Sequence, residues 1–326
     1  MPDIKERQAG ASCVGYSEVN KYAIYVYEKH FKGHKNYGDA TKINANELPD
    51  FDLLVGGFPC QAFSIAGKRL GFGDTRGTLF YDIARILSTK RPRYFLLENV
   101  KGLLSHNDGK TFQTILEVLT GLGYCVEWQV LNSKDFGVPQ NRERVFFSGH
   151  LGVEGFRKVF PIGGISQENN GQSCSTAIDA NYFKGIDNHG QRTAIAETQK
   201  LPDAQRIREI DGVASTLKGL GGGQGAKTGL YAIPVLTPDR AEKRQNGRRM
   251  KEDGDPSFTL TSQDKHGVFD GYRIRRLTPT ECERLQGFPD GWTESLSDSQ
   301  RYKCLGNAVT VNVIEEIMKQ IKSHIL

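Results

Sequence analysis

The stretch "DLLVGGFPCQAFS" (residues 52–64) decides the fold of the amino-terminal half of this 326-residue chain. Its apolar start is typical of a short buried β-strand, and the pair Gly56-Gly57 ends that strand in a sharp turn. Cys60 then follows Pro59 directly. A lone cysteine is ordinarily a small buried side chain. Here the glycine turn and the stiff proline favour a second interpretation, in which Cys60 is presented as a nucleophile.

The same strand pattern recurs through residues 1–150. Apolar runs such as "YFLLENV" (94–100) alternate with stretches whose apolar residues recur at helical spacing, such as "LFYDIARIL" (79–87). Strands that are each followed by a helix predict βαβ units and a parallel sheet, and functional groups gather at the carboxyl ends of such strands. Cys60, Glu98 and Glu18 are expected at these ends. The expected strands are 13–19, 52–58, 94–100, 125–132 and 144–150, and the expected helices are 20–31, 77–90 and 110–123.

The composition changes near residue 155, where Gly, Asn, Gln, Ser and Thr become more frequent. Three segments share one plan, a hydroxyl-rich strand, a glycine-containing turn and an apolar return strand, which predicts a small β-rich domain of hairpins. These segments are 174–195, 214–233 and 257–269. The predicted division is therefore a first domain over 1–155, a β-rich domain over 156–271, and a return to the first domain over 272–326.

Helical patterns resume in that last segment. Thr278 before Pro279 is typical of a helix cap and first turn, with Glu281 near the start. The stretch "VTVNVIEEIMKQIKSHI" (309–325) has one apolar face and predicts a closing helix.

The charge is uneven along the chain. The formal net charge is only +5, but "RAEKRQNGRRMK" (240–251) holds six cations against one acid. Such a run is as often a solvated face as a surface for a polyanion. The six cysteines lack Cys-x-x-Cys spacing, which argues against zinc clusters and disulfide frameworks and for a reducing cytoplasm. The chain shows no apolar run long enough to span a membrane and no apolar signal core at its start, so we expect a cytoplasmic protein that binds no metal.

Two further groups are candidates for chemistry. Glu98 follows an apolar strand, so partial desolvation would raise its pKa and let it hold a proton near neutrality. The alternative is an acid at a helix N-terminus with Asn99 as its cap. In "PQNRERVFF" (139–147), Arg142 and Arg144 enter a strand at positions i and i+2, which places both on one face. An ordinary surface strand remains the alternative for that pair.

Five motifs in order resemble the ordered motifs of the DNA (cytosine-5) methyltransferase family. The resemblance covers about residues 10–150 and 272–318. It implies an α/β, Rossmann-like adenosylmethionine-dependent methyltransferase sheet with a smaller β-rich target-recognition domain over 156–271. The motifs are "GGFPCQAFS" (56–64), "ENVKGLLS" (98–105), "VPQNRERVFF" (138–147), "RRLTPTECERLQGFPDGW" (275–292) and "LGNAVTVNV" (305–313).

The resemblance implies a mechanism. Cys60 would attack C6 of cytosine and so make C5 nucleophilic enough to take the methyl group of S-adenosylmethionine. Glu98 would protonate or hydrogen-bond N3, and Arg144 would bind O2. The cytosine must leave the duplex stack to reach the thiol, which implies base flipping. Supporting roles fall to Asn99, which would brace the Pro-Cys loop, and to Arg142 and Gln140 in the same pocket.

Cofactor contacts follow from the same resemblance. Glu18 matches the acid that binds the ribose hydroxyls, and Asp39 matches the contact to the adenine amine. Without the family frame, Asp39 is more simply a turn residue. Packing or backbone contacts to the cofactor are expected from Val19, Pro59, Leu79, Asn307 and Val309.

The resemblance also implies partners. The segment over 156–271 matches the family's target-recognition region in position, and its basic run suits phosphate contacts with double-stranded DNA. The chain would act as a monomer, and a cognate restriction endonuclease is a possible partner. The residues expected to contact DNA are Arg240, Lys243, Arg244, Arg248, Arg249 and Lys251.

This sequence departs from the family pattern at one place, and that departure leads to a second hypothesis for its function. The family opens with a strand and a Gly-rich loop of the type D/E-LF-x-G-x-GG, and this sequence has no such motif. We expect the true start to lie upstream; a natural truncation or a separate polypeptide that supplies the segment are the alternatives. The second functional hypothesis is therefore a non-catalytic DNA-binding relic or subunit. The third, an RNA cytosine-5 methyltransferase of the same fold, is disfavoured by the long variable region.

Overall fold

The structure, a computed structural model, describes residues 12–59, 79–152, 157–163, 233–238, 249–252, 255–269 and 274–325. The chain divides into two compact units. The first unit comprises Met1–Trp128 and Phe146–Phe156, and the second comprises Gln129–Val145 and Arg157–Leu326.

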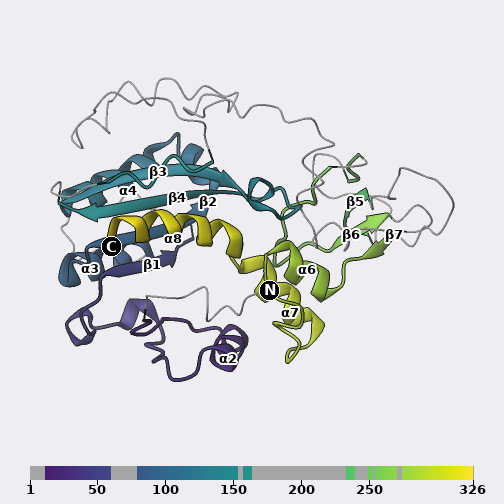
Figure 1. The fold of residues 1–326 in the computed structure, drawn as a ribbon, viewed down its shortest axis with the longest axis horizontal. Coiled ribbons are helices and arrows are strands. Elements are labelled where there is room, and N and C mark those ends of the chain that lie inside the picture. The colour runs from purple at the N-terminus through teal and green to yellow at the C-terminus, as the bar shows by residue number, and fades with distance from the viewer. Residues whose placement is uncertain are drawn as a thin grey trace. The chain divides into compact units, whose positions relative to one another are not determined.

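A sheet with strand order β1-β2-β4-β3 organises the first unit (Figure 1). β1 and β2 pair in parallel, with Gly57 opposite Glu98 at their carboxyl ends, as the βαβ pattern predicts. The strands are β1 (Leu53–Gly57), β2 (Tyr94–Val100), β3 (Tyr124–Asn132) and β4 (Glu143–Leu151), of which β3 and β4 continue into the second unit. The helices are α2 (Lys21–His30), α3 (Leu79–Lys90) and α4 (Lys110–Gly121), with short 3-10 turns η1 (Ala40–Lys42), η2 (Ala45–Glu47) and η5 (Lys101–Ser105).

The core of this unit is formed by the apolar residues of β2 and by the apolar faces of α3 and α4, as the spacing of apolar residues in the sequence predicts. The first four residues of β2, Tyr94–Leu97, are all buried, which is the mark of a strand covered on both faces. Helices α3 and α4 each bury one apolar stripe and expose the other side. The stripes consist of Phe80, Ile83, Ala84 and Leu87 on α3, and Phe112, Ile115, Leu116 and Leu119 on α4.

A glycine makes room for this core. A Cβ atom placed on Gly149 of β4 would lie 2.0 Å from Cε1 of Phe95 on β2. Phe95 is fully buried and forms an edge-to-face pair with Tyr124, at 5.1 Å between ring centroids. The missing side chain at Gly149 is therefore what lets the Phe95 ring pack across neighbouring strands.

The predicted strand at 13–19 is shorter than expected. Its described part forms one isolated bridge between Tyr16 and Asn36. Gly15 lies next to that bridge, and a Cβ there would approach the Tyr37 ring to 2.4 Å. Only glycine leaves room for this close approach of the Tyr37 ring to the backbone.

β1 forms an edge of the sheet. Within the described ranges it pairs only with β2, and Val55 is 58% exposed.

The second unit combines a small antiparallel sheet, in the order β5-β6-β7, with helices. β6 is the return strand of the predicted repeat over 257–269, while most of the other two repeats lies outside the described residues. The elements are β5 (Ile233–Leu236), β6 (His266–Phe269), β7 (Ile274–Arg276), α6 (Pro279–Leu285), α7 (Asp298–Asn307), α8 (Val311–Ile325) and the 3-10 turn η6 (Ser133–Phe136).

The start of α6 confirms the predicted cap. Thr278 accepts a hydrogen bond from the backbone N–H of Glu281, and the Glu281 carboxylate accepts one from the Thr278 N–H. An apolar cluster joins residues of β6, α6 and α7 with two residues outside these elements. Its buried members are Leu260, Val268, Leu277, Cys282, Leu285 and Leu305, with Phe288 and Tyr302 packed against them.

One expectation from the cysteines is wrong. Cys125 on β3 is disulfide-bonded in the structure. A disulfide needs only two thiols that meet in space, so scattered spacing argues against a framework of bridges but does not exclude an individual one. The three-part domain division stays a prediction, since the compact units follow different boundaries.

Candidate active site

The parallel pairing of β1 and β2 brings two predicted motifs together in the first unit. Gly57, three residues before Cys60, lies opposite Glu98. A Cβ on Gly57 would lie 3.1 Å from Oε2 of Glu98, so glycine leaves room for this half-buried carboxylate beside the end of β1. Cys60 itself lies outside the described residues.

Asn99 connects the two strand ends directly. It is 2% exposed, and its Nδ2 donates a hydrogen bond of 2.8 Å to the carbonyl oxygen of Phe58. Its Oδ1 accepts a hydrogen bond of 2.8 Å from the N–H of Val100. The amide thus holds the backbone immediately before Pro59 and Cys60. This is the contact that a brace for the Pro-Cys loop requires.

The second predicted group, around Gln140, lies in the second unit. Gln140 is fully buried. Its Nε2 donates to the carbonyl oxygen of Leu285 at 2.9 Å and to Oε1 of Gln286 at 3.2 Å, and its Oε1 accepts from the N–H of Leu260 at 2.8 Å. The side chain therefore ties the segment before β4 to two distant segments of the same unit.

The two arginines of this group have different surroundings. Arg142 is 3% exposed and donates to the carbonyl oxygens of Leu260 and Ala308, both at 2.8 Å, and of Gly306 at 3.4 Å. Arg144 is half-buried and donates to the carbonyl oxygen of Glu143 at 2.8 Å. The Arg142 guanidinium is thus buried and bonded to backbone carbonyls, as expected for a residue that supports the base pocket without contacting the base. Arg144 is the more accessible of the two arginines.

Three of the expected cofactor residues, Glu18, Val19 and Asp39, lie near the start of α2 and at the turn η1. Oε1 of Glu18 accepts from the N–H groups of Val19 at 2.8 Å and Asn20 at 2.7 Å, which fixes the carboxylate at this turn. The Val19 side chain is 69% exposed beside it. Asp39 caps η1, and its Oδ1 accepts from both N and Oγ1 of Thr41.

The hydrogen bonds from Thr41 lower the pKa of Asp39. This capping geometry is also what the simpler turn interpretation of Asp39 predicts. The remaining expected cofactor residues lie at element ends: Pro59 follows β1, Leu79 starts α3, Asn307 ends α7, and Val309 lies in the link to α8.

Two of the expected DNA contacts are described. Arg249 donates to the carbonyl oxygen of Thr237 at 3.4 Å. Lys251 donates to the carbonyl oxygen of Pro256 at 2.6 Å, lies over the Phe258 ring, and has a pKa lowered mainly by burial. The other four, Arg240, Lys243, Arg244 and Arg248, lie outside the described residues.

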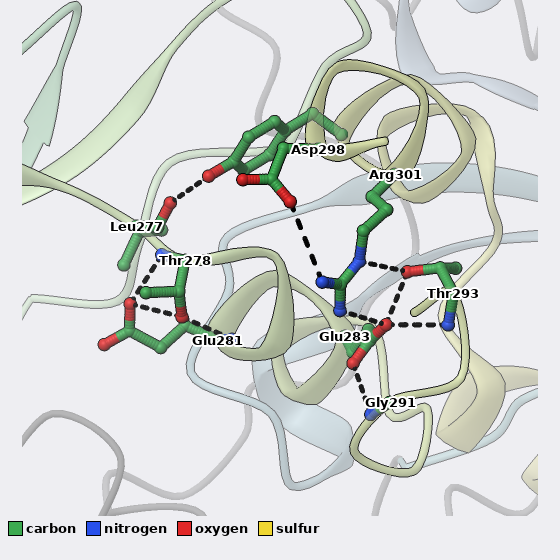
Figure 2. Close-up of polar contacts among 9 residues, drawn as sticks. Leu277, Thr278, Glu281, Glu283, Gly291, Thr293, Asp298 and Arg301 are labelled. Atoms are coloured by element: carbon green, nitrogen blue, oxygen red, sulfur yellow. Dashed lines mark hydrogen bonds and ion pairs between the residues drawn. The ribbon is translucent and has the colours of Figure 1, made fainter. Parts of the chain in front are cut away.

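Sequence reasoning missed a buried acid in α6. Glu283 is fully buried and accepts hydrogen bonds from the N–H groups of Gly291 and Thr293, both at 2.8 Å, from the Thr293 hydroxyl, and from Nη2 of Arg301 at 3.0 Å (Figure 2). These contacts fix the loop between α6 and α7. No spacing signal marked Glu283, because an acid in a short helix is normally exposed.

Gln286 and Thr310 were missed in the same way. Both are buried, and they join Gln140 in one network. The one sequence feature that could have indicated a buried Gln286 is its position between the apolar Leu285 and the turn at Gly287.

The α/β sheet, with β1 and β2 parallel and α3 between them in sequence, is of the Rossmann-like class, in which functional groups gather at the carboxyl ends of the strands. Comparison with known proteins then identifies the family. The chain belongs to the C-5 cytosine-specific DNA methylase family, whose sequence model matches residues 4–323. As a member it is a DNA (cytosine-5) methyltransferase, as the motifs predict.

The similarity to two methyltransferases covers nearly the whole length of this chain and of each relative. The chain is 34% identical to the orphan methyltransferase M.SPRI of Bacillus phage SPR, with 96% of this chain and 92% of the relative covered. It is 35% identical to the type II methyltransferase M.HhaI of Haemophilus parahaemolyticus, with 97% and 89% covered. The crystal structure of the S. pombe Dnmt2 methyltransferase shares the fold, with a TM-score of 0.62 at 19% identity over 99% of this chain and 94% of that one.

No helix in the described part of the chain is long and apolar enough to cross a membrane. Among the described residues, no group of three or more His, Cys, Asp or Glu side chains is arranged to hold a metal ion.

Proposed function

We propose that this protein transfers a methyl group from S-adenosylmethionine to C5 of a cytosine that is flipped out of a specific double-stranded DNA sequence. The observation that carries the proposal is the junction of two strand ends. The Asn99 amide holds the carbonyl of Phe58, and Glu98 lies opposite Gly57. A nucleophile at position 60 and an acid at position 98 would then face one base.

The residues of this chain would act as follows. The Cys60 thiolate adds to C6, forming an Sγ–C6 bond and moving an electron pair to C5. Glu98 holds a proton at N3, and Arg144 donates to O2, so both disperse the negative charge that develops on the ring. C5 would then take the methyl group, with S-adenosylhomocysteine as the neutral leaving group. Water would accept the C5 proton while the Sγ–C6 bond breaks, which restores the thiolate and the aromatic ring.

The residues near α2 fit the proposed methyl donor. A carboxylate fixed by two backbone N–H groups, as Glu18 is, can accept hydrogen bonds from ribose hydroxyls. The exposed Val19 offers apolar surface for an adenine ring. S-adenosylmethionine would supply an electrophilic methyl group on its sulfonium sulfur. Asn307 and Val309 would contact its methionine end.

DNA binding would draw on the basic run over 240–251. Cations clustered on one segment suit phosphate contacts, which position a protein on DNA without reading its sequence. We place the enzyme with its substrate in a bacterial or phage-infected cytoplasm and expect it to act as a monomer. A cognate endonuclease would be a separate partner.

The test is methyl transfer by the purified chain. We expect labelled methyl groups to pass from S-adenosylmethionine to cytosine in duplex DNA, and Cys60→Ser to abolish transfer while leaving duplex binding intact. Duplex carrying 5-fluorocytosine at the target should give a covalent protein–DNA species on a denaturing gel.

Other outcomes would select another hypothesis. Salt-dependent DNA binding without binding of S-adenosylmethionine would favour the non-catalytic relic. Transfer to tRNA in preference to duplex DNA would favour the RNA methyltransferase.

A further inference from the structure

Gln286 sits at the centre of a buried polar network in the second unit. Its side chain is fully buried just after α6. Its Nε2 donates to the carbonyl oxygens of Leu305, at 2.6 Å, and Ala308, at 3.2 Å. Its Oε1 accepts from Oγ1 of Thr310, at 2.9 Å, and from Nε2 of Gln140, at 3.2 Å. Both donors and both acceptor positions of the amide are used, so its orientation is fully determined.

Gln286 holds both the end of α7 and the link from α7 to α8. Gln286 bonds to Leu305, Ala308 and Thr310, and Thr310 is 1% exposed. The intervening residues differ, since Asn307 is exposed and Val309 is half-buried. The hydrogen bonds to the carbonyl oxygens of Leu305 and Ala308 hold the backbone on both sides of Asn307. The contacts at Ala308 and Thr310 hold it on both sides of Val309.

The network also includes Gln140, which lies in the segment that leads to Arg144, the residue proposed to bind the base. Gln140, held by Gln286, lies two residues before Arg142 and four before Arg144. Arg142 reinforces the connection, because it donates to the carbonyl oxygen of Ala308 as well. One amide thus contacts both the segment that leads to Arg144 and the link that holds Asn307 and Val309.

We infer that Gln286 is a positioning residue that sets the link around Asn307 and Val309 for the methyl donor and holds that link in register with the strand that carries Arg144. This inference rests on the proposed function, which assigns cofactor contacts to Asn307 and Val309 and a base contact to Arg144. Gln286 itself touches neither substrate; it acts through backbone carbonyls and through Gln140. A small displacement of such supporting groups changes reaction rates strongly.

The experiment compares three variants of the full chain with the wild type. Gln286→Met keeps the length of the side chain and removes all four hydrogen bonds. Thr310→Val removes the hydrogen bond from the link to Gln286, together with the hydrogen bond of 2.8 Å between the hydroxyls of Thr310 and Ser133. Thr310→Ser restores the hydroxyl. Gln129→Met is the matched control, because Gln129 makes two hydrogen bonds to Ile162 in the same unit but none to the link.

The readouts are the Kd for S-adenosylmethionine by calorimetry, kcat and KM on duplex DNA, and thermal unfolding. We expect Gln286→Met to weaken S-adenosylmethionine binding by about tenfold and to lower kcat by about tenfold. Thr310→Val should weaken binding of the methyl donor by about threefold with kcat unchanged, and Thr310→Ser should restore it. Gln129→Met should bind S-adenosylmethionine as the wild type does.

The outcomes separate the two proposals. If the wild type transfers methyl groups and folded Gln286→Met binds S-adenosylmethionine like the wild type, the positioning role is wrong. If Gln286→Met does not fold, Thr310→Val decides, and unchanged binding in that variant overturns the inference. If the wild type itself neither binds S-adenosylmethionine nor transfers methyl groups, the proposed function fails and the inference falls with it.

Discussion

The Nδ2 of Asn99 lies 2.8 Å from the carbonyl oxygen of Phe58, which ties the end of β2 to the loop that leads into Cys60. Asn99→Ala removes this donor from the carbonyl oxygen of the buried Phe58. We expect the variant to fold, to lose about 1–3 kcal/mol of stability, and to lose more than tenfold in kcat, because the loop that presents the nucleophile is released.

The measurements for Asn99→Ala are urea unfolding and methyl transfer under saturating DNA. Asn44→Ala is the control, because Asn44 caps the exposed turn η2 of the same unit. A variant that is destabilised as expected but keeps the wild-type kcat would show that Asn99 has no catalytic effect.

Glu283 and Arg301 form a buried ion pair at 3.0 Å in the second unit (Figure 2). Glu283→Ala leaves Arg301 and the N–H groups of Gly291 and Thr293 without their acceptor. Removing one partner of a buried pair costs about 3–5 kcal/mol. Glu316→Ala, which breaks the exposed pair with Lys319, should change stability by less than about 0.5 kcal/mol. Similar losses for both variants in urea unfolding would contradict this assignment.

His266 makes the second unit sensitive to acid. The pKa of His266 is lowered from 6.5 to about 4, mainly by burial; Asp264 acts in the opposite direction, and Arg276 adds to the lowering. The folded state thus binds fewer protons at His266 than the unfolded state between these pH values. Its contribution to stability is complete above pH 6.5 and is lost progressively as the pH falls toward 4, by about 3 kcal/mol in total.

The measurement is the free energy of unfolding at pH 7.5, 5.5 and 4.5. The wild type should lose more stability on acidification than His266→Gln, whose amide oxygen can still accept the hydrogen bond from the N–H of Thr261. Equal pH dependence in the two proteins would show that His266 is not the group responsible.

Gly149→Ala tests the close packing of the first unit. The added methyl group would overlap the Phe95 ring, so we expect a loss of about 1–3 kcal/mol or more. Phe95→Leu in the same chain should recover part of that loss by removing the clash. Gly121→Ala is the control, since a Cβ there meets nothing within 4 Å near the end of α4, and it should be neutral or stabilising by up to about 1 kcal/mol. An undisturbed Gly149→Ala variant would contradict the packing of Phe95.

The basic run should govern the salt dependence of DNA binding. Alanine at Arg240, Lys243, Arg244 and Arg248 should reduce the slope of log K against log salt by about 0.9 for each phosphate contact removed. Lys251→Met should reduce that slope less, because the Lys251 ammonium group is bound to the carbonyl of Pro256. Fluorescence anisotropy between 50 and 200 mM salt measures both variants, and an unchanged slope in the fourfold variant would assign the run to a solvated face.

The sequence by itself determined the elements and the family of this protein. The helical spacing in α3 and α4, the continuous apolar run of β2, and the Thr278-Pro279 cap are local patterns, and local patterns depend only on residues near each other in the chain. The order of the motifs identified the family for the same reason. No distant contact was needed for any of these predictions.

Only the tertiary structure decided which polar residues serve the interior. Arg142 and Arg144 are two positions apart and alike in sequence, yet Arg142 is buried against the carbonyls of Leu260 and Ala308 while Arg144 remains accessible. The Gln286 side chain forms its four hydrogen bonds with residues of other segments, and one of them, Gln140, lies far away in the sequence. A buried polar group must be satisfied by whichever donors and acceptors the fold brings to it, and that pairing is settled by contacts between segments far apart in the chain.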